Sequence, residues 1–200
     1  MSTMQYDVWS VSADSSTTYF RAAAAIGAAG ALALLKANLG TNGYGYKVSI
    51  TSNGNDSGIT FTITGNKVGL ITNTPTITET VTGPNNTTVF STNYYSRITS
   101  ITVSGTSANN VSIGYGGDLA LPRTRIKGMY YVGGGSAGSI TVTSPNREFA
   151  LLKIATPASA TTFADSLFIP SEGILVGGEC FNDYATVATS NVTSYTLICG

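Results

Sequence analysis

Regular alternation of apolar and hydroxyl-bearing residues is the feature that most limits what this chain can fold into. Residues 59–64 read Ile-Thr-Phe-Thr-Ile-Thr, and residues 48–51 read Val-Ser-Ile-Thr. Successive side chains of a β-strand point to opposite faces, so this pattern predicts a half-buried antiparallel sheet. Between the two runs, residues 52–58 (SNGNDSG) concentrate the residue types that favour a hairpin turn.

Similar short runs recur at intervals of about ten residues along the rest of the chain, which is typical of a β-sandwich or barrel. The glycines and proline between residues 116 and 122 indicate a boundary. We therefore predict an all-β fold of two tandem antiparallel sandwich- or barrel-like modules with an N-terminal extended arm. The arm and first strand take residues 1–40, module 1 takes residues 41–118 and module 2 takes residues 119–200.

Alternating residues near the start predict an extended arm or a first strand. Tyr6, Val8 and Trp9 are candidates for docking on a neighbouring subunit, although Trp9 would equally serve to cap the protein's own core. If residues 5–20 dock, deleting residues 2–20 should abolish binding and leave the fold intact. The first ten residues hold no lysine or arginine, so we expect no export signal.

Residues 22–39 admit two interpretations. Alanine and leucine favour a helix, but Gly27 and Gly30 each cost about 1 kcal/mol inside one. Leu32 and Leu34 alternate with alanines, which fits a strand from Gly30 to Leu39. From the residues alone, helix and strand are nearly even.

Charged residues make up 10% of the chain, against about 25% in an average globular protein. Ten basic residues balance ten acidic ones, so nothing is shaped to attract nucleic acid. No apolar run is long enough for a membrane helix. A surface so poor in charge suits a homo-oligomer or a protein covered by partners.

The chain has no histidine, and its serines and acids form no recognisable catalytic pattern. We predict no enzyme activity and no catalytic, cofactor-binding or metal-binding residues. Residues 54–58 are better explained as a turn than as a calcium loop. Cys180 and Cys199 are most simply two small buried side chains, and a disulfide between them stays open.

Two pairs of adjacent tyrosines are candidates for surface contacts with a sugar or a subunit: Tyr94, Tyr95, Tyr130 and Tyr131. Ordinary sheet packing, with alternate rings facing in and out, is the favoured explanation for them.

Several segments resemble modules of virion structural proteins of tailed bacteriophages, notably marine cyanophages. The first module matches GYKVSITSNGNDSGITFTITG, ETVTGPNNTTVFSTNYYSRITSITVSG and NVSIGYGG. The second matches RIKGMYYVGGGSAGSITVTS, ATPASATTFADSLFIPSEGIL and NVTSYTLICG. Together they cover about residues 40–200. The resemblance implies an extended segment before GYKVSI, which favours a strand for Gly30 to Leu39, and it brings no active site.

We therefore expect a non-enzymatic virion protein, made in the host cytoplasm, that acts as a capsid decoration or cement protein. Its partners would be the major capsid protein or neck and tail proteins, and no nucleic acid, membrane or cofactor is expected. A neck, tail or fibre component is the alternative within this class. A carbohydrate-binding β-sandwich module is the alternative from another class.

Overall fold

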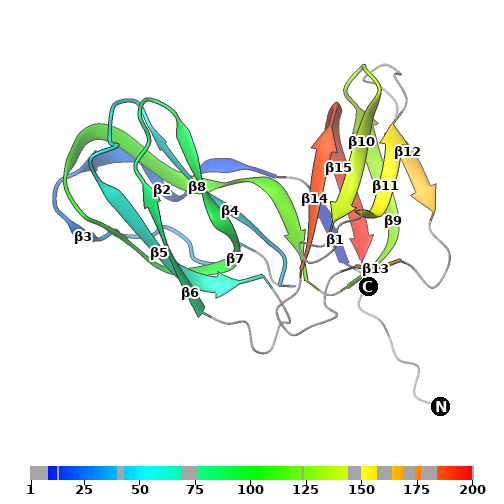
Figure 1. The fold of residues 1–200 in the computed structure, drawn as a ribbon, viewed down its shortest axis with the longest axis horizontal. Helices are drawn as coiled ribbons and strands as arrows, with labels where there is room; N and C mark the ends of the chain where they lie inside the picture. Colours follow the sequence, from blue (N-terminus) through cyan, green and yellow to red (C-terminus); the bar gives the residue numbers. More distant parts are fainter. Residues whose placement is uncertain are drawn as a thin grey trace, which may run out of the picture. The chain divides into compact units, whose positions relative to one another are not determined.

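The structure, a computed structural model, shows a chain built from antiparallel β-strands (Figure 1). It describes residues 9–12, 14–39, 43–68, 76–122, 124–143, 150–156, 164–168, 174–176 and 184–199. Within these ranges there is no helix. The predicted all-β, antiparallel, sandwich-like fold is confirmed.

The chain divides into two compact units, one of which is inserted into the sequence of the other. Asp14–Ala120 forms the inserted unit, and Met1–Ala13 together with Leu121–Gly200 forms the terminal unit. The division lies at 120/121, whereas the predicted boundary lay at 118/119. Within the predicted arm of residues 1–40, Trp9–Ser12 pairs in the terminal unit and Ser16–Ile26 pairs in the inserted unit.

The described residues of the inserted unit form seven strands, and five of them follow one another in the sheet order β8-β4-β7-β5-β6. β2 pairs with β8, and β3 pairs with β7. The strands are β2 (Ser16–Ile26), β3 (Gly30–Ala31), β4 (Gly45–Ser52), β5 (Thr60–Lys67), β6 (Thr76–Thr82), β7 (Thr88–Val103) and β8 (Ser107–Leu121).

The alternation in the sequence decides which face of the inserted unit is buried. Phe61 and Ile63 on β5 are fully buried, while the alternating Thr60, Thr62 and Thr64 are only partly covered. Removing large apolar side chains from water contributes roughly 1.5–3 kcal/mol each, which fixes the strand register. Other strands supply further residues of this core, including Phe20, Ile26, Tyr46, Val48, Ile50, Tyr95, Ile98, Ile101, Val103, Val111 and Ile113.

A bulge in β7 divides that long strand into two parts. Lys47 and Ser49 are two residues apart, but their partners Tyr94 and Phe90 are four apart. Ser91 bridges the extra residues: its hydroxyl accepts a hydrogen bond from the Val48 amide and donates one to a carbonyl within the bulge, both at 2.8 Å. β4 pairs with β7 on both sides of the bulge, from Thr88 to Tyr95, and β5 pairs with β7 from Tyr95 to Val103.

The ambiguous segment of residues 22–39 is extended and not helical. Residues 22–26 complete β2, and only Gly30–Ala31 of the expected Gly30–Leu39 strand has regular pairing as β3. The remainder still bonds to β7, because the Leu32 amide donates to the Ile101 carbonyl at 2.9 Å and the Leu39 amide donates to Ser96 at 2.9 Å. Pairing to neighbouring strands outweighs the helix propensity of alanine here.

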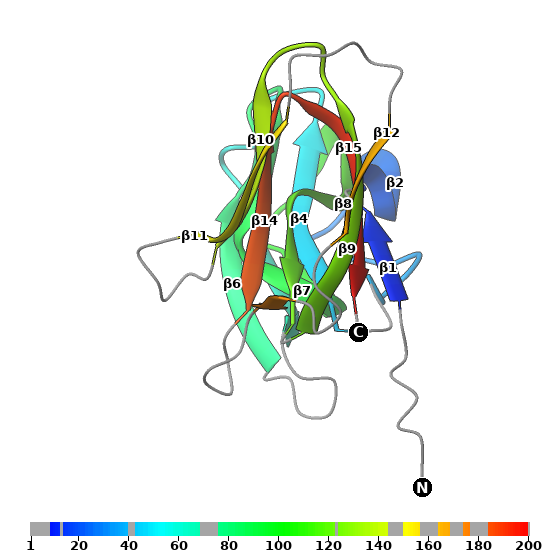
Figure 2. The same ribbon diagram turned by 90° about the vertical axis from the view of Figure 1, so that its right-hand side faces the viewer.

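The terminal unit contains two sheets. One has the order β1-β15-β9-β12, with β13 also on β9, and the other has β10 between β11 and β14 (Figure 2). The strands are β1 (Trp9–Ser12), β9 (Thr124–Gly133), β10 (Gly138–Thr143), β11 (Ala150–Thr156), β12 (Ala164–Phe168), β13 (Ile174–Val176), β14 (Ala185–Ser190) and β15 (Val192–Cys199). Its buried apolar residues include Val11, Ile126, Met129, Ile140, Val142, Ala185, Val187, Leu197 and Cys199.

Candidate functional site

Three of the four tyrosines predicted as surface contacts are buried. Tyr94, Tyr95 and Tyr131 are at most 7% exposed, and only Tyr130 is substantially exposed, at 46%. On β9 the two tyrosines alternate inward and outward, as sheet packing requires. At the β7 bulge both rings are covered, because the bulge interrupts the alternation. The four tyrosines therefore form no surface platform.

Of the three predicted docking residues, only Trp9 lies within the residues that the structure describes. Tyr6 and Val8 lie outside the described residues. Trp9 is the first residue of β1, where its backbone pairs with Cys199. Residues 9–12 and 16–20 are strands of the protein's own sheets, so the expectation that deletion of residues 2–20 spares the fold is wrong.

An exposed apolar segment, which we call the alanine–glycine ribbon, covers residues 22–35. It holds no charged residue and lies between Arg21 and Lys36. Eleven of its fourteen residues are exposed, and Leu35 reaches 65%. Contiguous apolar surface of this kind on a folded protein marks a contact site. The sequence shows that residues 22–35 carry no charge. It does not show that they are exposed, because the sequence alone does not decide between a helix and a strand for this segment.

Hydrogen bonds hold the ribbon in one conformation. The Arg21 guanidinium donates to the carbonyls of Ala24 at 3.0 Å, Ala25 at 2.9 Å and Val111. The Leu35 amide donates to the Phe20 carbonyl at 2.8 Å, which ties the far end of the ribbon to β2. Buried Ile26 anchors the ribbon at the end of β2. The ribbon is therefore a preformed surface (Figure 1, the blue segment from β2 to β3).

A second surface, on the outer face of β5 and β6, consists of hydroxyl groups. Thr62 lies opposite Thr80 with their hydroxyl oxygens 3.4 Å apart, and Thr64 lies opposite Thr78 with theirs 3.2 Å apart. Such pairs stabilise neighbouring strands and carry no charge. A partner that covers this face buries hydroxyls that already have a hydrogen-bond partner, and this costs less than burying charges.

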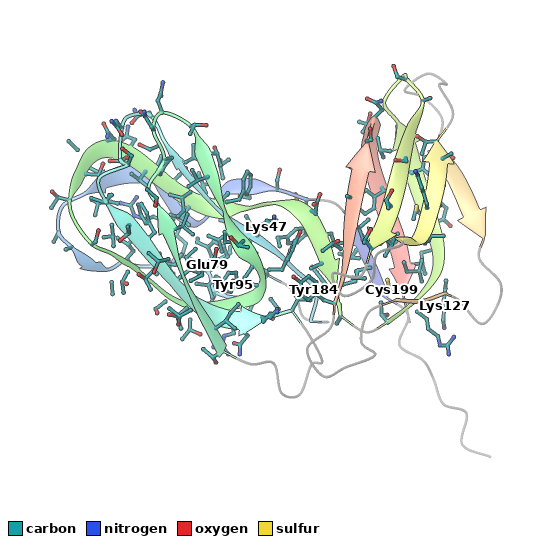
Figure 3. All side chains as sticks on the ribbon, in the orientation of Figure 1. Lys47, Glu79, Tyr95, Lys127, Tyr184 and Cys199 are labelled. Carbon is teal, nitrogen blue, oxygen red and sulfur yellow. The ribbon has the colours of Figure 1, made fainter. Side chains whose placement is uncertain are left out.

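Glu79 of β6 stabilises the β7 bulge. Its carboxylate accepts hydrogen bonds from the Thr92 amide at 2.5 Å, the Asn93 amide at 3.0 Å and the Asn93 side chain at 2.9 Å. The Tyr95 hydroxyl donates a longer bond of 3.4 Å (Figure 3). Burial raises the pKa of Glu79, but these bonds outweigh burial and hold that pKa below its usual value.

Asp56 organises the turn of residues 52–58 by accepting hydrogen bonds from three side chains. The side chain is 5% exposed and accepts hydrogen bonds from the hydroxyls of Ser52 and Ser107, both at 2.5 Å, and from the Asn109 side chain at 3.1 Å. Burial raises the pKa of Asp56, yet the three bonds lower it overall. Donors from the protein itself occupy this carboxylate, which supports the turn interpretation.

Four tyrosines that are distant in the sequence cluster in the inserted unit. The Tyr115 ring lies 5.0 Å from Tyr19 and 4.9 Å from Tyr46, and Tyr44 lies 6.2 Å from Tyr46. The Tyr115 hydroxyl donates to Asp14 at 2.7 Å. Burial, followed by this bond, raises the pKa of Tyr115. Sequence reasoning missed the cluster because no local pattern joins these residues.

Lys36, at the end of the ribbon, contacts the same cluster. Its ammonium nitrogen lies 4.7 Å from the centre of the Tyr19 ring, which is a cation–π distance. The Tyr19 hydroxyl donates to the Asn38 carbonyl at 2.6 Å. Tyr19 and Tyr44 are half-buried, so part of each ring remains accessible to a ligand.

Cys199 is a free, buried thiol, and Cys180 lies outside the described residues. Burial raises the pKa of Cys199 to about 12, which keeps the thiol protonated and unreactive. Among the described residues, no group of three or more cysteines and acids could hold a metal ion. No helix in that part of the chain is long and apolar enough to cross a membrane.

Comparison with known proteins identifies no relative. No family model, no curated protein and no solved structure matches the chain. The function must therefore be argued from the residues and their arrangement.

Proposed function

We propose that the chain is a non-enzymatic structural protein of a tailed-bacteriophage virion and acts as a capsid decoration or cement protein. The observation that carries the proposal is the exposed alanine–glycine ribbon. A soluble monomer gains nothing from an uncharged surface of this kind, whereas an assembly component buries it against a neighbour.

The composition of the whole chain supports the same role. Equal numbers of acidic and basic residues leave no net charge, and the threonine face on β5 and β6 adds an uncharged hydroxyl surface. Close packing on a shell favours surfaces that can be covered without desolvating charges. The resemblance of residues 40–200 to phage virion modules points to the same class of protein.

Co-sedimentation with phage heads tests the proposal. Heads of the phage that encodes the chain are stripped of accessory proteins, mixed with the purified full chain and sedimented. We expect the chain to sediment with the heads and Gly27→Glu to bind less. An added side chain at Gly27 meets no atom within 4 Å, so this change places a charge on the ribbon without a clash.

Ala155→Glu is the matched control, since Ala155 is an exposed residue of β11 in the terminal unit. It adds the same charge to a residue that is not part of the ribbon, and we expect it to bind as the unmodified chain does. A chain that stays in the supernatant with every head preparation contradicts the decoration role. Sedimentation with isolated tails instead favours the neck, tail or fibre alternative.

Carbohydrate binding is the second candidate, and the tyrosine cluster is the observation that favours it. Half-buried rings of Tyr19 and Tyr44 beside the Asp14 carboxylate combine stacking surfaces with a hydrogen-bond acceptor. A glycan array with the full chain tests this function. Binding that Tyr44→Ala abolishes and Tyr130→Ala preserves supports it, and an array without any binding contradicts it.

A further inference from the structure

We infer that the tyrosine cluster around Tyr115 recognises an organic ammonium group on its ligand. The inference deepens the carbohydrate-binding candidate and rests on it, because both place the ligand on the same rings. It adds the chemistry that selects the glycan, which is a positively charged substituent such as choline or the amine of an amino sugar. Two charged residues beside the rings, Asp14 and Lys36, carry the evidence.

An ammonium group already lies on the cluster in this structure. The Lys36 nitrogen is 4.7 Å from the centre of the Tyr19 ring, a distance at which the electron-rich face of the ring attracts a cation. Lys36 is exposed, and holding its long side chain in one conformation costs entropy, so a ligand can displace it. The lysine ammonium is also strongly hydrated, whereas a methylated ammonium loses less hydration on contact with the rings. Lys36 therefore shows which chemical group the Tyr19 ring accepts.

The rings of the cluster face several directions. The planes of Tyr19 and Tyr115 meet at 80°, and those of Tyr44 and Tyr46 meet at 88°. Rings that stand nearly at right angles surround a bulky cation better than one flat platform does, and aromatic cages of this kind bind quaternary ammonium groups. Tyr19 and Tyr44 are half-buried, so part of each ring is open to a ligand.

A carboxylate beside the rings supplies the opposite charge. The Tyr115 hydroxyl donates to one oxygen of Asp14 at 2.7 Å, and the Ser15 amide donates to the other at 2.8 Å, which holds the carboxylate against the cluster. In the described part of the chain, exposed Asp14 accepts these hydrogen bonds but forms no ion pair. An ammonium group is attracted both by this charge and by the rings, whereas an uncharged sugar gains nothing from the charge.

Three hydroxyl groups of the cluster lie near the same carboxylate. Burial raises the pKa of Tyr44 most, and Tyr19 and Asp14 raise it further. The pKa of Tyr115 rises through burial, through its bond to Asp14, and through the nearby charges of Asp14, Tyr19 and Tyr44. Charge effects of this kind weaken with distance, so these groups lie close together. Tyr44 and Tyr115 therefore stay neutral at physiological pH, which leaves the Asp14 charge to attract a cation and to repel an acidic sugar.

NMR titration of the full chain tests the inference with two matched pairs of probes. Choline is compared with dimethylbutanol, its uncharged carbon isostere, and glucosamine is compared with N-acetylglucosamine, which has no ammonium group. We expect choline and glucosamine to bind in the millimolar range and the uncharged probes to bind at least about tenfold more weakly. The amide signals of Ser15, Tyr19 and Tyr44 should shift, and that of Tyr130 should not.

Three variants assign the binding to the charged residues. Asp14→Asn keeps an acceptor for the Tyr115 hydroxyl but removes the charge, and it should weaken choline binding at least about fivefold. Lys36→Met removes the competing ammonium and should strengthen choline binding. Asp118→Asn is the matched control, because it removes the same charge from an exposed position outside the cluster, and it should bind like the unmodified chain. Circular dichroism confirms that the variants remain folded.

Two results would overturn the inference: no shift with choline or glucosamine up to about 100 mM, or equal binding of the charged and the uncharged probes. A glycan array that includes amino sugars separates the inference from the candidate function. Neutral glycans that bind through Tyr44, without any response to choline, refute the ammonium group alone. Choline binding that Asp14→Asn weakens, without any glycan bound on the array, refutes the carbohydrate-binding function alone.

Discussion

At the scale of single residues, two carboxylates stabilise the inserted unit by accepting hydrogen bonds from neighbouring segments. Asp56 joins the turn after β4 to the start of β8, and Glu79 joins β6 to the β7 bulge. Because each is surrounded by donors, removal of the acceptor leaves polar groups unpaired. These two sites are where substitutions should have their largest effects.

Asp56→Ala should lower the free energy of unfolding by about 2–4 kcal/mol, because it leaves the hydroxyls of the buried residues Ser52 and Ser107 without their acceptor. Urea denaturation measures the change. Asp118→Ala, at an exposed position, is the control and should shift stability by less than about 0.5 kcal/mol. Equal effects of the two substitutions would contradict the role given to Asp56.

Stability should fall at acidic pH through the same two groups. The pKa values of Asp56 and Glu79 are lowered in the folded chain, so their contribution is complete above the ordinary carboxyl pKa of about 4. It is lost as the pH falls through the lowered values. With no histidine in the chain, the melting temperature should stay nearly level from about pH 5 to 8.

Calorimetry across pH checks this profile, with the double variant Asp56→Asn, Glu79→Gln as the comparison. The variant should melt lower at neutral pH and lose less stability between about pH 5 and 3 than the unmodified chain. Parallel pH profiles for the two proteins would refute the assignment.

At the scale of elements, the path of β2 depends on a glycine beneath it. A Cβ added at Gly114 would overlap the Ser16 carbonyl oxygen, so β2 passes directly over β8 at this point. Gly114→Ala should therefore displace the start of β2 and cost about 3 kcal/mol or more. Gly58→Ala is the control, because its added Cβ meets nothing within 4 Å. Thermal melts of both variants test the difference, and a fully stable Gly114→Ala would contradict it.

How far the sequence predicts the elements depends on where their partners lie. Strands with clear alternation, such as β5, could be predicted because the apolar residues of the strand itself identify the face that is buried. The ribbon could not, since its extended form comes from pairing with β7 and β8, which follow much later in the chain. The tyrosine cluster and the Glu79 bonds likewise join residues that no local pattern connects.

At the scale of the whole molecule, one unit is inserted into the sequence of the other, so the chain passes between the units twice. The sequence predicted only one of these two boundaries. The end near residue 120 had a glycine and proline signal. The boundary near residue 13 has no such sequence signal, because the residues of β1 and β2 have the pattern of one extended segment. The two ends of the inserted unit meet, since Asp14 bonds to Tyr115 and Ser16 pairs with the same residue.

A fragment of residues 14–120 should therefore fold without the remainder of the chain. It keeps its own apolar core, and adjacent termini are typical of inserted domains. Circular dichroism should show a β-sheet spectrum and a cooperative thermal transition. A fragment without a transition would show that the unit depends on the terminal unit.

We propose that this chain is an abundant part of a virion, and its copy number in purified particles tests this proposal most directly. Quantitative mass spectrometry of washed particles should find the chain in numbers comparable to the major capsid protein. Absence of the chain from washed particles would contradict the account.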